Sequence, residues 1–190
     1  TRKDDRFIEL YERGAIANKA KADLFVSVHC NSSPSKDAHG SGSYVLGLHA
    51  NDINFEVAKE ENQVIFLEKD YKERYAGYDI NSPESFIGLS IMQEEYLEQS
   101  IQAAKRVQSS LAENTQRRDR GVKQAGFIVL HQTYMPAMLI ETGFLSNQEE
   151  RDYLNSATGQ QQIASSIVKA IKSYYNWLKN NSQLSKEAAA

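Results

Sequence analysis

The segment "LFVSVHCNSS" at residues 24–33 constrains the fold more than any other part of the sequence. Its alternating positions are mostly apolar on both sides: Leu24, Val26 and Val28 in one set, and Phe25 in the other. Strands that are apolar on both faces are typical of parallel sheets covered by helices. The segment therefore predicts a buried strand over 24–29 that ends on His29.

Helical and strand patterns alternate along the rest of the chain. Helical spacing occurs at 4–20, 55–67, 89–113 and 159–179, and strand patterns occur at 24–29, 40–48, 127–131 and 137–142. This alternation predicts an α/β fold, a three-layer domain with a mostly parallel twisted central sheet flanked by helices. Ser146 and Glu149 fit a capping box that opens a short helix. Residues 68–88 are predicted to be irregular, and 180–190 a disordered polar tail.

Composition excludes several classes of protein. Lys plus Arg is 22 and Asp plus Glu is 25, a balance that argues against a nucleic-acid binder. The densest basic run, "QRRDR" at 116–120, is predicted to be a solvated loop. No apolar run reaches the roughly 18 residues of a membrane-spanning helix. The chain opens abruptly on "TRKDDRF", so we do not expect this to be the native start.

Two residues carry the chemical hypotheses. His29 ends one predicted strand, and Glu141 lies on the apolar strand "AMLIET". Ligands of open α/β sheets bind at the carboxyl ends of parallel strands, and a buried carboxylate needs a partner or a metal. With a single cysteine, Cys30, a metal here must use His and carboxylate ligands.

Taken alone, these residues can also have purely structural roles. His29 can be structural, and Glu141 can pair with an arginine or cap a helix. His131 is a weaker candidate at the same edge, while His39 and His49 are expected to be solvated.

Two long motifs resemble one family. "DDRFIELYERGAIANKAKADLFVSVHCNSS" is similar to the middle of a zinc-dependent N-acetylmuramoyl-L-alanine amidase domain of amidase type 3, whose strand ends in a His-x-Asn motif. "MPAMLIETGFLSNQEERDYL" resembles its C-terminal signature, and "QQQIASSIVKAIKSYYNW" its last helix. The resemblance covers residues 1–179 and implies a catalytic domain.

The resemblance implies a function and a site. These enzymes use a zinc-activated water to cleave the amide between N-acetylmuramic acid and L-alanine of the peptidoglycan stem peptide. His29 would be a zinc ligand and Glu141 the catalytic acid/base. It also implies a bacterial, extracytoplasmic protein with peptidoglycan as partner. The alternatives are a zinc peptidase of similar mechanism and a catalytically incomplete cell-wall binding module.

The sequence departs from the family pattern at the zinc site. The family's other two ligands are a His in an early Gly-His-Gly-Gly loop and a Glu soon after it; both are expected before the position where this sequence begins, and no "GHGG" occurs here. "AHGSG" at 38–42 lies after it, in the wrong place. We therefore expect an N-terminally incomplete domain, with an incomplete zinc site and no activity of its own.

Residues 51–113 form an insertion that resembles those of cell-division amidases. In some of these, a helix covers the zinc cleft until an activator protein removes it. The resemblance thus suggests that 68–88 shields the cleft, with an acid such as Glu84 near the metal, although 89–113 alone reads as a core helix.

Overall fold

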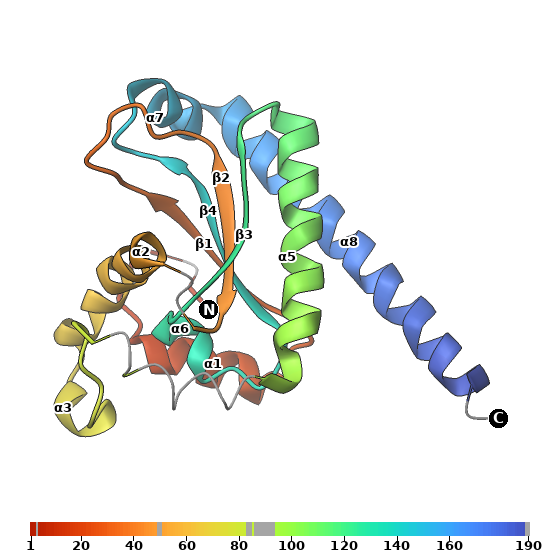
Figure 1. Ribbon diagram of the computed structural model, residues 1–190, viewed down its shortest axis with the longest axis horizontal. Helices are drawn as coiled ribbons and strands as arrows, with labels where there is room; N and C mark the ends of the chain where they lie inside the picture. Colours follow the sequence, from red (N-terminus) through yellow and green to blue (C-terminus); the bar gives the residue numbers. More distant parts are fainter. Residues whose placement is uncertain (3, 49–50, 83–84, 86–93, 189–190) are drawn as a thin grey trace. The chain divides into compact units, whose positions relative to one another are not determined.

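A computed structural model describes residues 1–2, 4–48, 51–82, 85 and 94–188. The elements, shown in Figure 1, are α1 (Leu10–Lys19), β1 (Phe25–Asn31), β2 (Ser41–Leu46), α2 (Asp52–Asn62), the 3-10 helix η1 (Gln63–Leu67), α3 (Tyr71–Arg74), α5 (Glu94–Thr115), β3 (Asp119–Ala125), α6 (Ile128–His131), β4 (Ala137–Phe144), α7 (Gln148–Asn155) and α8 (Ala157–Ala188). None of the helices that the structure describes is long and apolar enough to cross a membrane.

The four strands form one open sheet in the order β1-β4-β2-β3. Phe25 N donates to Pro136 O at 2.9 Å where β1 and β4 begin, and Leu145 N donates to Asn31 O at 2.8 Å where they end. These two bonds show that β1 and β4 run parallel. The α/β fold with a mostly parallel sheet is thereby confirmed.

Strand β1 is less covered than its sequence predicts. It lies at the edge of the sheet, and Val28 is 56% exposed. By contrast, every residue of β2 and β4 is buried. The apolar run at 24–29 thus reflects an edge strand rather than one covered on both faces.

By its contacts the chain divides into two compact units, and each strand passes from one to the other. The first unit comprises 1–28, 44–101 and 123–140. Its core contains the fully buried side chains of Phe127, Leu130 and Leu139. Helix α1 packs against α6 in this unit.

A carboxylate far along the chain caps helix α1. The helix predicted over 4–20 begins later than expected, because α1 starts at Leu10, and its N-cap Glu9 makes no side-chain capping bond. The buried Glu68 instead accepts hydrogen bonds from Leu10 N at 2.6 Å and from the Tyr75 hydroxyl at 2.9 Å. The segment after η1 is thus bound to the first turn of α1.

Residues 127–131 form the short helix α6, not the predicted strand. The buried Asn62 explains the difference, because its Oδ1 accepts from Ile128 N at 2.9 Å while its Nδ2 donates to Gly126 O at 2.8 Å. The Asn62 side chain, at the end of α2, therefore accepts a hydrogen bond from a backbone N–H in the first turn of α6, as an N-cap residue does. A run of apolar residues is compatible with either structure.

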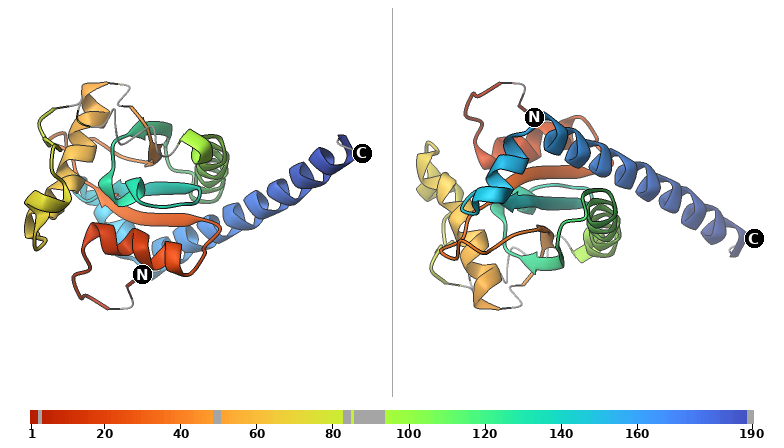
Figure 2. Two further views of the ribbon diagram at one scale, coloured as in Figure 1. Left: turned by 90° about the horizontal axis from the view of Figure 1, so that it is seen from below. Right: turned by 90° about the horizontal axis from the view of Figure 1, so that it is seen from above.

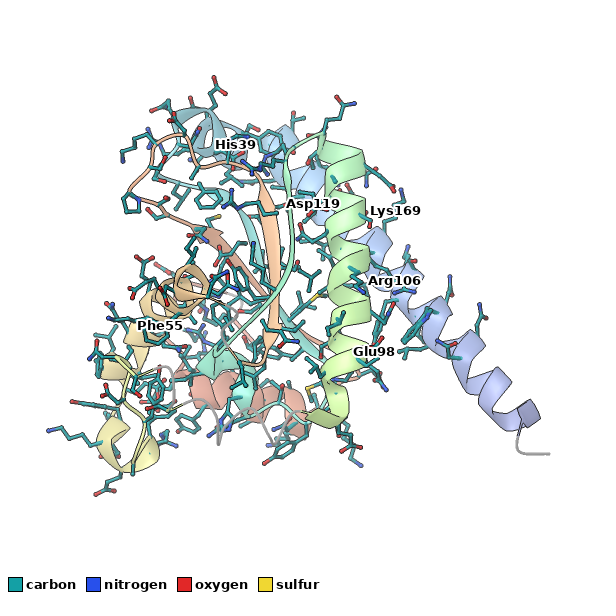
Figure 3. All side chains as sticks on the ribbon, in the orientation of Figure 1. His39, Phe55, Glu98, Arg106, Asp119 and Lys169 are labelled. Carbon is teal, nitrogen blue, oxygen red and sulfur yellow. The ribbon has the colours of Figure 1, made fainter. Side chains whose placement is uncertain are left out.

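The second unit comprises 29–43, 102–122 and 141–190. Here α7 packs against α8, and Ser110 Oγ of α5 donates to Ser166 O of α8 at 2.9 Å. Further along, the guanidinium of Arg106, a residue labelled in Figure 3, lies 5.0 Å from the centre of the Trp177 ring. Both contacts join the long helices α5 and α8.

Helix α8 runs without interruption to Ala188, as Figure 2 shows, so residues 180–188 are helical rather than the irregular tail expected. The cap of α7 also differs by one residue from the prediction. Asn147 Oδ1 accepts from Glu150 N at 3.1 Å, whereas Ser146 Oγ accepts from Ser33 N at 3.0 Å. Asparagine is as good an N-cap as serine. Loop geometry therefore decides that Asn147 rather than Ser146 caps α7.

Candidate active site

His29 and Glu141 lie on neighbouring parallel strands, β1 and β4. Thr142 Oγ1 donates to His29 O at 2.8 Å, and Cys30 Sγ lies 3.3 Å from Thr142 Oγ1. Side chains alternate between the faces of a strand, so Cys30 and Thr142 share one face while His29 and Glu141 share the other. The structure therefore brings the two predicted site residues together.

His29 and Glu141 differ in burial. Glu141 is 2% exposed, whereas His29 is half-buried. Within the part of the chain that the structure describes, one group of three side chains could hold a metal ion: His29, Glu61 and Glu141, whose ligand atoms all lie within 4.8 Å of one another. An imidazole nitrogen and carboxylate oxygens are ligands that zinc takes in proteins. The donor set thus fits zinc.

Glu61 is the member that sequence reasoning missed. It lies on α2, in the helical stretch "VAKEENQ", where charged residues read as a solvated face. Nothing in the spacing distinguishes Glu61 from Glu56 or Glu60, which lie on the same helix.

The other candidates lie elsewhere or outside the described residues. His131 ends α6 in the first unit, where burial lowers the pKa of its imidazole. His39 is exposed, as expected, and its Nδ1 donates to Asp37 O at 2.8 Å. Cys30 is exposed. His49 and Glu84 lie outside the described residues.

A buried ion pair supports the strand that carries Glu141. Arg117 and Glu150 form a two-pronged ion pair, with 12% and 8% of their side chains exposed. Arg117 Nη1 also donates to Thr142 O at 2.7 Å, so the backbone next to Glu141 is held by this guanidinium. The prediction of a solvated loop for "QRRDR" thus holds only in part: Gln116 and Arg118 are exposed, but the Arg117 side chain is 12% exposed and β3 begins at Asp119.

Glu150 satisfies two backbone amides besides Arg117. Its Oε2 accepts from Gly40 N at 3.1 Å and from Phe144 N at 3.0 Å. Gly143 lies directly against the ion pair, and a Cβ there would collide with both the Arg117 and the Glu150 side chain. Position 143 therefore requires a glycine while the ion pair is in place.

An α/β fold with a histidine and a glutamate on adjacent parallel strands defines a protein with a potential metal site at one end of its sheet. Comparison with known proteins identifies the family. The family profile for N-acetylmuramoyl-L-alanine amidase matches residues 1–173, so the chain belongs to that family. The resemblance seen in the two sequence motifs is confirmed.

Individual relatives agree with this assignment. N-acetylmuramoyl-L-alanine amidase AmiC of Escherichia coli O6:H1 is 33% identical over 180 residues, which cover 92% of this chain and 41% of AmiC. AmiA of Escherichia coli K12 is 28% identical over 192 residues, 98% of this chain and 64% of AmiA. The chain therefore spans less than two thirds of either relative.

A solved structure shares the fold. The crystal structure of N-acetylmuramoyl-L-alanine amidase from Clostridium difficile 630 superimposes with a TM-score of 0.63 at 26% identity, covering 93% of this chain and 70% of that one.

Replacing Glu150 tests the support of the site. We expect Glu150→Gln to lower the free energy of unfolding by about 3 to 5 kcal/mol, because it leaves the buried Arg117 charge without its partner. Urea unfolding followed by circular dichroism measures this change. The neighbouring Glu149→Gln, on an exposed side chain, is the matched control and is expected to stay within about 0.5 kcal/mol of the parent. Equal stability of the two variants would contradict the assigned role.

Proposed function

We propose that this chain carries part of the active site of a peptidoglycan hydrolase. The reaction is cleavage of the amide between the lactyl group of N-acetylmuramic acid and L-alanine of the stem peptide. The pairing of His29 with Glu141 on adjacent strands, in a chain that belongs to the amidase family, is the observation that carries the proposal. Because the substrate is a cell-wall polymer, the protein would act outside the cytoplasm of a bacterium.

The residues of the group have distinct roles in this proposal. His29 would hold zinc, and Glu61 would be a further ligand in the occluded form proposed below; zinc when bound polarises a carbonyl and lowers the pKa of a water. A carboxylate oxygen of Glu141 would accept the proton of the attacking water and then donate it to the leaving nitrogen. Because amines are poor leaving groups, this second transfer matters as much as the first.

We further propose that this chain alone binds zinc weakly. A catalytic zinc needs three protein ligands besides its open position, and reserving Glu141 for proton transfer leaves His29 and Glu61. We expect substoichiometric zinc after dialysis, no turnover of muropeptides, and a further loss of zinc in Glu61→Gln. Atomic absorption and a muropeptide assay measure both. Tight one-to-one zinc with turnover would refute the idea.

Glu141→Gln tests the acid/base role in a protein with a complete site. We expect turnover to fall by about 10²–10⁴-fold, because an amide cannot move the proton, while zinc stays bound. The assay detects new amino termini on L-alanine. New amino termini elsewhere in the peptide would indicate a zinc peptidase. If the unsubstituted protein with a complete site showed no turnover, a cell-wall binding module would be indicated instead. Retained activity in the variant would remove Glu141 from the mechanism.

The insertion at 51–113 suggests a regulatory role. We propose that Glu61 of α2 acts as an occluding carboxylate at the site, and that a protein activator relieves the occlusion. The proximity of Glu61 to the other two ligands supports this. A protein partner has precedent within the fold, since the CwlD amidase of Clostridioides difficile has been solved in complex with the GerS lipoprotein.

The occlusion can be tested in an enzyme with a complete zinc site, by measuring its turnover in the absence of an activator. Glu61→Gln is expected to raise activity measured without any activator several-fold, because a ligand that competes with substrate is removed. Glu56→Gln, on the same helix, is the control and should leave it unchanged. Lower activity in Glu61→Gln, with the fold intact by circular dichroism, would show that Glu61 supports catalysis instead.

A further inference from the structure

A second potential binding site lies in the second unit, beyond the carboxyl ends of β1 and β4. It is an open pocket of about 670 Å³, a size in the range of ligand sites. The lining comes from the loop after β1 and from the first turn of α7 with the residues before it: Lys36, Asp37, His39, Ser146, Asn147, Gln148, Glu149 and Arg151. None of these residues belongs to the His29 group.

Hydrogen bonds between the two loops hold the pocket in place. Ser33 N donates to Ser146 Oγ at 3.0 Å, and Asn147 Nδ2 donates to Lys36 O at 2.9 Å. His39, labelled in Figure 3, is fixed by its bond to Asp37 O. The loop that follows β1 is thus bound to the start of α7, and specific hydrogen bonds hold the wall of the pocket together.

The charges of the lining are balanced. Lys36 and Arg151 bring two positive charges, and Asp37 and Glu149 bring two negative charges. A ligand of one sign would meet an equal number of opposing and like charges. A ligand segment with an ammonium and a carboxylate side by side can pair with both.

The position of the pocket relates it to Glu141 along strand β4. Ser146 is five residues beyond Glu141, and a strand rises about 3.3 Å per residue, so the two are at most about 17 Å apart. An extended peptide also spans about 3.3 to 3.6 Å per residue. A stem peptide whose first amide lies at Glu141 would therefore reach the pocket with its third to fifth residues.

We infer that this pocket binds the distal part of the stem peptide, through a segment that carries both an ammonium and a carboxylate. The inference rests on the proposed function, because it names the part of that substrate which lies away from the scissile amide. Lys36 pairs with the carboxylate and Glu149 with the ammonium. Both side chains are exposed, so their substitution leaves the core intact.

Binding can be tested without turnover. The probe is the tripeptide L-Ala-γ-D-Glu-L-Lys, whose last residue has an ammonium and a carboxylate, titrated into the zinc-free chain and followed by amide shifts in NMR spectra. Two analogues each lack one charge: the Nε-acetyl form and the C-terminal amide. We expect each to bind about 2 to 5-fold more weakly, as for exposed charge pairs, with shifts at 36–39 and 146–151.

Variants assign each charge to its partner. Lys36→Gln should bind the free acid and the amide equally, and Glu149→Gln should bind the free and acetylated forms equally, because the coupling is lost. Lys172→Gln and Glu12→Gln remove like charges from exposed positions elsewhere and should keep both differences. Persistence of both differences in the pocket variants, or shifts confined to other residues, would overturn the inference. Neither outcome depends on hydrolysis, so failure here leaves the proposed activity standing.

Discussion

The buried ion pair of Arg117 with Glu150 is the interaction on which the end of the sheet that carries His29 and Glu141 depends. Burying two charges is costly, and the cost is offset when hydrogen bonds satisfy the remaining donors and acceptors. Here Glu150 accepts from Gly40 N and Phe144 N, while Arg117 donates to Thr142 O. One pair of side chains therefore joins the start of β2, the approach to β3, the end of β4 and helix α7. Gly143 belongs to the same constraint, because any side chain there would displace the pair.

The site depends on strand register as well as on this pair. Strands β1 and β4 are parallel neighbours, and the bond from Thr142 to His29 O sets residue 29 beside residue 141. Slipping either strand by one residue would move its side chain to the opposite face. Cys30 and Thr142 would then occupy the positions of the histidine and the glutamate. The hydrogen bonds at Phe25 and Leu145 fix the same register at both ends of the pair.

The sequence singles out two residues that the structure brings together, but it predicts several of the surrounding elements wrongly. Glu141 stands out because a carboxylate on an apolar strand is costly without a partner, whereas His29 stands out through the family motif that it shares. Strand β3 was missed because "DRGVKQA" is mostly polar, and in the sheet it is a partly exposed edge. Helix α6 was mistaken for a strand because what decides its structure is Asn62, a residue distant in the chain. Glu61 and Glu150 could not be singled out, since their partners are likewise distant and both read as surface charges on helices.

The second unit suggests how one sheet edge can serve both chemistry and recognition. Strand β4 carries Glu141 and then leads through Ser146 into the first turn of α7, while β1 carries His29 and then leads into the loop at 33–39. The Ser33 and Asn147 bonds fix these two exits to each other. A displacement of α7 would therefore move the pocket and, through Glu150 and Arg117, the backbone beside Glu141. The rigidity that aligns the candidate acid/base group also fixes its distance from the charges that would bind the far end of the peptide.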